Sequence, residues 1–89
     1  MATHNVSPIS LLGRQVSFRD LHFEQQLLDM TIPPDCPKEL LSSVRTGLVT
    51  EFVIRLPLNG HAITEILVDD VCYDVSECDF LNLTLRTDL

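Results

Sequence analysis

Residues 50–68 read TEFVIRLPLNGHAITEILV, and they give the clearest structural signal in the chain. Two runs rich in β-branched and aromatic residues, 50–57 and 62–68, flank the dipeptide Asn59-Gly60. Both residues of this dipeptide tolerate positive φ, which favours the type I′ turn of a two-residue hairpin. We therefore predict an antiparallel hairpin here, with Pro57 marking the end of its first strand or an edge position.

Three other segments resemble strands. Residues 14–20 alternate between polar and apolar side chains, which is typical of a half-buried strand. Residues 71–75 favour a short additional strand. Residues 80–86 alternate as well, and they predict a last strand whose inward-facing residues are Leu81, Leu83 and Leu85.

The segment 23–32 is compatible with two structures, a helix or a strand over residues 25–32. As a helix it would place Phe23, Leu27 and Met30 on one face, and its Glu, Gln and Leu residues favour that form. As a strand it would pair with residues 14–20, and the β-branched residues at its end favour this alternative. We favour the strand.

Residues 37–46 predict a helix. Pro37 suits the first helical position, and Glu39 and Arg45 match the dipole at the two ends. Gly47 is a natural C-terminal cap. The apolar residues of this segment would face the sheet as one stripe, formed by Leu40, Leu41, Val44 and Leu48.

Taken together, these elements predict the α+β class. Their order is roughly β-β-α-β-β-β, which indicates a small antiparallel sheet of about four to five strands with one helix packed on one face. The chain has 89 residues, so we expect a single domain over residues 9–89 after a loose N-terminal arm, residues 1–8. An aliphatic core in so small a domain favours a homodimer.

The acidic residues are concentrated toward the end of the chain. The formal net charge is −7, and residues 65–89 hold seven of the 13 acids but only one base. This distribution argues against direct binding of a nucleic-acid backbone and against docking on an anionic membrane. Two interpretations remain: the acids keep the protein dispersed, or they form a docking face for a basic partner.

The three cysteines predict an intracellular protein. The first residues lack the basic and apolar regions of a secretory signal, and no apolar run approaches the length of a membrane span. We therefore expect a reducing, cytoplasmic environment in which all three thiols stay free.

Sequence motifs give no catalytic residue, no cofactor and no metal site. Cys72 and Cys78 are six residues apart, a spacing unlike the paired cysteines of structural zinc. The acidic run 69–79 lacks the spacing and the central Gly of an EF-hand loop. The glycines are isolated, so neither a P-loop nor a dinucleotide fingerprint is present.

The sequence therefore predicts a non-catalytic protein-interaction module that docks through an acidic surface. It would act as an inhibitor, an adaptor or a regulatory subunit of the kind that viruses and mobile elements encode. Tyr73 would be the anchor of the contact, because tyrosine combines apolar area with a polar tip. The predicted partner-binding residues are Asp69, Asp70, Tyr73, Asp74, Glu77 and Asp79.

Two alternative functions compete with this prediction. The first is a nucleic-acid-related regulator, acting as an acidic mimic of a phosphate backbone or as a dimer with a basic face from Arg14, Arg19 and Arg55. The second is a small enzyme that uses Cys36, whose thiol would be activated at the start of the predicted helix.

Overall fold

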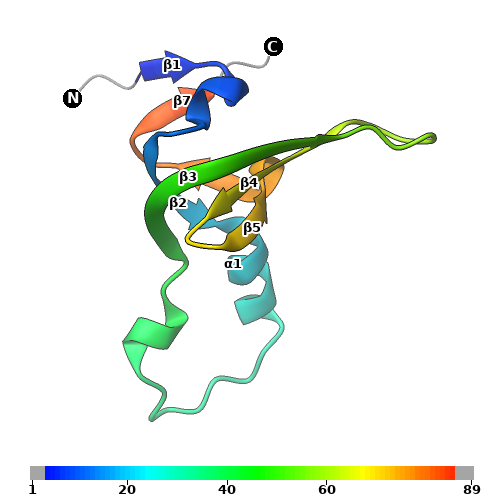
Figure 1. The fold of residues 1–89 in the computed structure, drawn as a ribbon. Helices are drawn as coiled ribbons and strands as arrows, with labels where there is room; N and C mark the ends of the chain where they lie inside the picture. Colours follow the sequence, from blue (N-terminus) through cyan, green and yellow to red (C-terminus); the bar gives the residue numbers. More distant parts are fainter. Residues whose placement is uncertain (1–3, 86–89) are drawn as a thin grey trace.

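The computed structural model describes residues 4–85 and confirms the α+β class (Figure 1). Its main element is a five-stranded antiparallel sheet with the strand order β5-β4-β3-β2-β6. These strands are β2 (Gln15–Asp20), β3 (Val44–Arg55), β4 (Ile63–Val68), β5 (Val71–Asp74) and β6 (Cys78–Phe80). A separate parallel pair is formed by β1 (His4–Val6) and β7 (Leu83–Leu85). The helical elements are α1 (Leu21–Leu28) and three short 3-10 turns, η1 (Pro8–Leu11), η2 (Lys38–Leu41) and η3 (Val75–Glu77).

The long strand β3 curls the sheet. Its first half pairs with β2 and its second half with β4, and a bulge lies between Val49 and Glu51. A bulge bends a strand and increases its twist, so the two halves of the sheet turn toward each other. The outer strands β5 and β6 are joined by η3 alone, although they lie at opposite ends of the strand order. So short a link requires the two edges of the sheet to lie close together.

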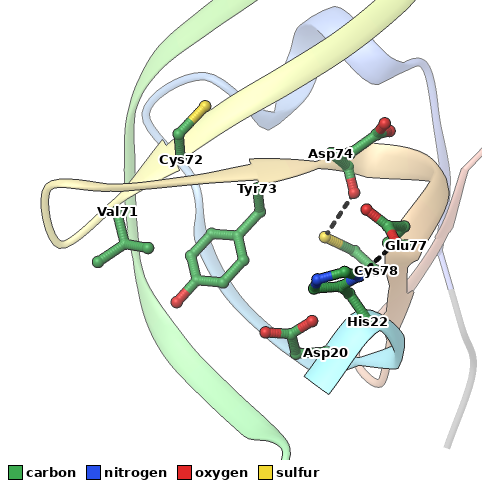
Figure 2. A pocket seen from close by; sticks show the side chains of 8 residues that line it. All are labelled: Asp20, His22, Val71, Cys72, Tyr73, Asp74, Glu77 and Cys78. Carbon is green, nitrogen blue, oxygen red and sulfur yellow. Dashed lines mark hydrogen bonds and ion pairs between the residues drawn. The ribbon is translucent and has the colours of Figure 1, made fainter. Parts of the chain in front are cut away.

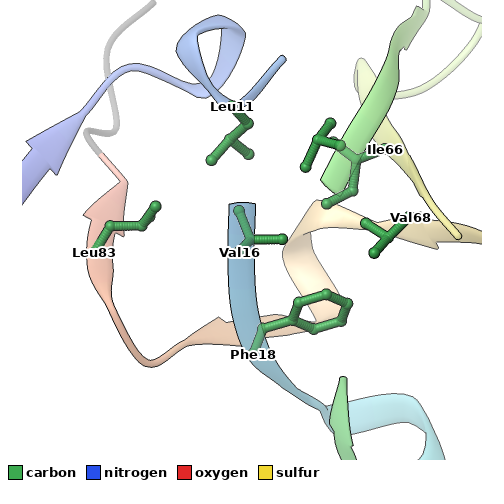
Figure 3. Packing of buried hydrophobic residues seen from close by; sticks show 7 residues of the cluster. Leu11, Val16, Phe18, Ile66, Val68 and Leu83 are labelled. Atoms are coloured by element: carbon green, nitrogen blue, oxygen red, sulfur yellow. The ribbon is translucent and has the colours of Figure 1, made fainter. Parts of the chain in front are cut away.

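The core fills the inside of this curled sheet (Figure 3). Phe18 of β2 lies at its centre, and the ring of Tyr73 from β5 meets it edge-on at 5.0 Å between ring centroids. Leu11 of η1 and Leu83 of β7 close the core from the side of the terminal strands. The buried hydrophobic residues of the described chain are Leu11, Val16, Phe18, Val49, Ile66, Val68 and Leu83.

The predicted hairpin is present, but its turn is not the predicted one. Strands β3 and β4 pair as far as Arg55 and Ile63, which leaves residues 56–62 as a loop. Asn59 does not have positive φ, so the type I′ turn at Asn59-Gly60 is wrong. Pro57 explains the difference, because a residue without an N–H cannot continue the ladder toward a tight turn.

The turn with positive φ at both central residues, as in type I′, instead joins β4 to β5. Val68 pairs with Val71, and the two residues between them, Asp69 and Asp70, have φ of 51° and 64°. Asp is among the few non-glycine residues that adopt this left-handed conformation readily. The segment Val71–Asp74 is the predicted short strand.

The helix predicted for residues 37–46 is wrong. Only Lys38–Leu41 is helical, as a 3-10 turn, and β3 begins at Val44. Leu40 is 66% exposed and Val44 is exposed as well, so the predicted inward stripe does not exist. Gly47 is no helix cap but a buried strand residue, where a Cβ would lie 2.7 Å from the Oδ2 of Asp69. Pairing with β2 overrides the helix-like end signals of this segment.

The α-helix of the described residues, α1, overlaps the segment 25–32 for which we favoured a strand. Asp20 caps α1 by accepting a hydrogen bond from the Phe23 N–H at 3.2 Å. Phe23 and Leu27 are half-buried, in line with the helical alternative, but the helix ends at Leu28 and Met30 is exposed. The antiparallel partners of β2 are therefore β3 and β6, not residues 25–32.

Both ends of the described chain also differ from the prediction. The expected loose arm is ordered from His4 onward, because β1 pairs with β7, and its residues 1–3 lie outside the described residues. The predicted last strand, 80–86, is divided between β6 and β7 by Leu81 and Asn82, and Arg86 lies outside the described residues. Leu81, expected to face inward, is 53% exposed, whereas Leu83 is buried.

Within residues 4–85, no helix has both the length and the apolar character needed to cross a membrane.

Candidate functional site

A pocket of about 180 Å³ lies where β5, η3 and the start of α1 meet (Figure 2). We call it the acidic pocket. Figure 2 shows the side chains of Asp20, His22 and Tyr73 directed into the same space, with Glu77 and Cys78 beside them. The residues that line it are Asp20, His22, Val71, Cys72, Tyr73, Asp74, Glu77 and Cys78.

Local contacts hold the walls of the acidic pocket together. Nδ1 of His22 lies 3.2 Å from Oε2 of Glu77, which connects α1 to η3. The thiol of Cys78 donates to the carbonyl oxygen of Asp74 at 3.3 Å, which connects the two outer strands. The carboxylate of Asp74 accepts from the N–H of Ser76 at 2.9 Å and thereby caps η3. Strands and helix are thus fixed around the pocket before any ligand arrives.

The acidic pocket has an excess of negative charge. Three acidic residues line it, Asp20, Asp74 and Glu77, and His22 is the one lining residue that can become cationic. The Asp74 carboxylate lies at the rim, on the side of β5 opposite the Tyr73 ring, and accepts hydrogen bonds from Ser76 (Figure 2). The nearest arginine is Arg45, whose Nε lies 3.9 Å from Oδ2 of Asp20. Arg45 itself is held against the ring of Phe23, with its guanidinium carbon 4.9 Å from the ring centroid. A cationic group is therefore the complementary ligand.

The thiols of the acidic pocket are protonated at neutral pH. Burial, followed by the charges of Asp20, Asp74 and Glu77, raises the pKa of Cys78 to about 12. Desolvation and the neighbouring Glu65 also raise the pKa of Cys72. A thiolate is the nucleophilic form of cysteine, so neither thiol is activated for attack.

The structure gathers only some of the predicted partner-binding residues. Tyr73, Asp74 and Glu77 line the acidic pocket together. Asp69 and Asp70 lie outside it, at the turn that leads into β5. Asp79 does not line the pocket either, because its carboxylate pairs with Arg19 at 3.0 Å on β2.

Tyr73, the predicted anchor of the contact, lies at the acidic pocket. Its ring is half-buried and packs against Phe18, and burial raises the pKa of its hydroxyl. It therefore forms an apolar wall of the acidic pocket.

Five lining residues are absent from the predicted partner-binding set: Asp20, His22, Val71, Cys72 and Cys78. Asp20 and His22 are more than 50 positions away from Asp74 and Glu77, and they reach the pocket because β2 pairs with β6. The available signal was an N-cap residue, Asp20, followed by a run rich in helix-forming residues.

The premises of the two alternative functions are weaker in the structure. Among the three arginines of the proposed basic face, Arg19 is paired with Glu24 and Asp79, and Arg55 with Glu65. For the enzyme, no α-helix follows Cys36, so the dipole expected to activate its thiol is missing. Among residues 4–85, no group of three or more histidine, cysteine or carboxylate side chains is arranged to hold a metal ion.

Comparisons with known proteins give no relative: no family model, no curated protein and no solved structure matches this chain.

Proposed function

We propose that this chain is a small, non-catalytic protein-interaction module that binds a basic partner, with the acidic pocket as the centre of the contact. The observation that carries the proposal is the meeting of three acidic residues and an aromatic wall around a space of about 180 Å³. A module of this kind would serve as an inhibitor, an adaptor or a regulatory subunit in the cytoplasm.

The ligand group that fits the acidic pocket is one lysine or arginine side chain of the partner. Its cationic end would donate hydrogen bonds to the carboxylate of Glu77 and, at the rim, to that of Asp74, and its aliphatic stem would lie along Tyr73 and Val71. Asp74 is suited to this contact because, among the described residues, it has no ion-pair partner of its own.

The charge of the whole chain supports the same proposal. A net charge of −7 attracts a basic partner from a distance and speeds the encounter. Asp69 and Asp70 extend the negative surface beyond the pocket, at the exposed β4–β5 turn. Their role would be to guide the partner, because neither of them lines the pocket.

A hexa-arginine peptide is a suitable probe, and calorimetry or NMR titration would measure its dissociation constant. The pocket variant is Asp74→Asn with Glu77→Gln. We expect it to bind about tenfold more weakly, since it removes two solvent-screened ion pairs worth roughly 0.5–1 kcal/mol each, and about 1.4 kcal/mol corresponds to a factor of ten.

The matched control is Asp29→Asn with Asp35→Asn. It removes the same amount of charge at two exposed positions outside the acidic pocket. We expect this control to weaken peptide binding by about twofold at most, through long-range electrostatics that salt screens. Equal losses in both variants would contradict the proposal and would leave the acids a role in solubility alone.

A further inference from the structure

The hairpin formed by the end of β3 and the start of β4 extends far beyond the core. We call residues 54–65 the hairpin arm. Figure 1 shows it projecting away from the rest of the molecule. Leu56 is 80% exposed and Leu58 is 97% exposed, and Ile54 and Ile63 beside them are also exposed. Large apolar side chains gathered on one projecting element are typical of a surface that another protein covers.

The hairpin arm is electrically neutral, unlike the rest of the chain. Its two charged residues, Arg55 and Glu65, bind each other at 2.6 Å between Nε and Oε1. The net charge of −7 is therefore located outside the arm. Two copies of this acidic chain repel each other over most of their surfaces. A contact between the two neutral arms avoids this electrostatic repulsion.

The exposed area is large enough for a stable contact. The chain exposes 6508 Å², whereas a folded protein of 10.0 kDa typically exposes about 5,200 Å². The radius of gyration is 14.7 Å, against about 12 Å for a compact domain of this length. The hairpin arm shares this excess area of roughly 1,300 Å² with the exposed segment between α1 and β3, and a standard interface needs ~800 Å² from each partner (Figure 1).

We infer that the hairpin arm is a self-association element and that two copies of the chain dimerise by packing their arms together across a two-fold axis. In such an isologous contact the same apolar residues, Leu56 and Leu58 above all, meet their own counterparts or close neighbours. None of the residues 54–65 lines the acidic pocket. The dimer therefore presents two acidic pockets at once, which would give it avidity for a partner with repeated basic groups.

Sedimentation velocity over a range of concentrations tests this inference. The arm variant is Leu56→Asp with Leu58→Asp, which would place four carboxylates in the dimer contact. We expect the wild type to dimerise and the arm variant to dissociate about a hundredfold more readily. Both side chains are exposed in the monomer, so circular dichroism should show an unchanged fold. Leu56→Ser with Leu58→Ser gives a second variant that adds no charge.

The matched control is Leu28→Asp with Leu40→Asp. These residues are 78% and 66% exposed and lie outside the arm, so the control adds the same charge to other apolar surface. We expect it to dimerise like the wild type. A monomeric wild type, a dimer that survives in both arm variants, or equal loss in the control would overturn the inference. Binding of single arginine side chains should stay the same in the arm variant, which separates this test from that of the proposed function.

Discussion

At the scale of single residues, Arg19 connects three elements of the fold. Its guanidinium contacts both carboxylate oxygens of Glu24, at 2.9 and 2.7 Å, and it reaches Asp79 at 3.0 Å. The hydroxyl of Ser43 donates to the same Glu24 carboxylate at 2.5 Å. Strand β2, helix α1 and strand β6 are thus joined at one point on the surface, opposite the core.

This arrangement predicts a specific dependence of stability on pH. The hydrogen bonds from Arg19 and Ser43 lower the pKa of Glu24 from 4.5 to about 2. Because the pKa is lower in the folded than in the unfolded state, the charged carboxylate stabilises the fold. Its contribution is complete above about pH 4.5 and disappears as the pH falls toward 2.

Urea unfolding at a series of pH values would measure this effect. We expect the free energy of unfolding of Glu24→Gln to decline less steeply than that of the wild type between pH 4.5 and 2. Glu39→Gln is the control, because the Glu39 carboxylate makes no hydrogen bond or ion pair with other described residues. A Glu24→Gln profile parallel to that of the wild type would contradict the prediction.

At the scale of elements, the strands could be predicted where their own side chains alternate. The hairpin strands, the strand at residues 15–20 and the short strand at 71–74 all follow such patterns. The helix prediction for residues 37–46 was wrong because Pro37, Glu39 and Gly47 are residue types that commonly occur at the ends of helices. What determines the structure of this segment is the partner strand β2, which no local pattern reveals.

The candidate site was predictable only in part for the same reason. Asp74 and Glu77 stand out by composition, since they belong to an acidic run. Asp20 and His22 depend on a helix that we did not favour and on a pairing of β2 with a distant strand. The contact of Tyr73 with Phe18 could not be predicted, because the curling of the sheet that brings the two rings together has no signature in the sequence.

The two turns of the β3–β4–β5 meander predict opposite responses to substitution. Asp70 has φ of 64°, so Asp70→Ala should cost about 1 kcal/mol of stability, whereas Asp70→Gly should not be destabilising. Asn59 itself does not have positive φ, so Asn59→Ala should change stability by less than about 0.5 kcal/mol. Thermal unfolding measures all three variants. A larger loss for Asn59→Ala than for Asp70→Ala would show that the turns are assigned the wrong way round.

At the scale of the whole molecule, a small hydrophobic core stabilises a chain of extended shape. The described chain buries few large side chains, and its dimensions are 44 × 39 × 22 Å. Each buried residue therefore contributes a large share of a stability that is typically only about 5–15 kcal/mol. Leu83 is one such buried residue. It closes the core on the C-terminal side, where it packs with Leu11 and Val16 (Figure 3).

Leu83→Ala should lower the free energy of unfolding by about 2–5 kcal/mol, since it leaves a cavity beneath β1 and β7. Leu81→Ala removes the same side chain from an exposed position and should cost less than about 1 kcal/mol. Urea denaturation of the two variants side by side makes the comparison. Equal losses would mean that residues 80–86 form the single strand with three inward leucines after all.

The pairing of β2 with β6, and of β1 with β7, sets the order of events during protein synthesis. Phe18 pairs with Phe80, and His4 with Leu83, so early residues find their partners near the end of the described chain. While the ribosome still holds residues 78–85, β2 has a neighbour on one side only, and the core lacks Leu83. The nascent chain therefore exposes its apolar residues until this last segment emerges, and during that interval it is a natural client for chaperones.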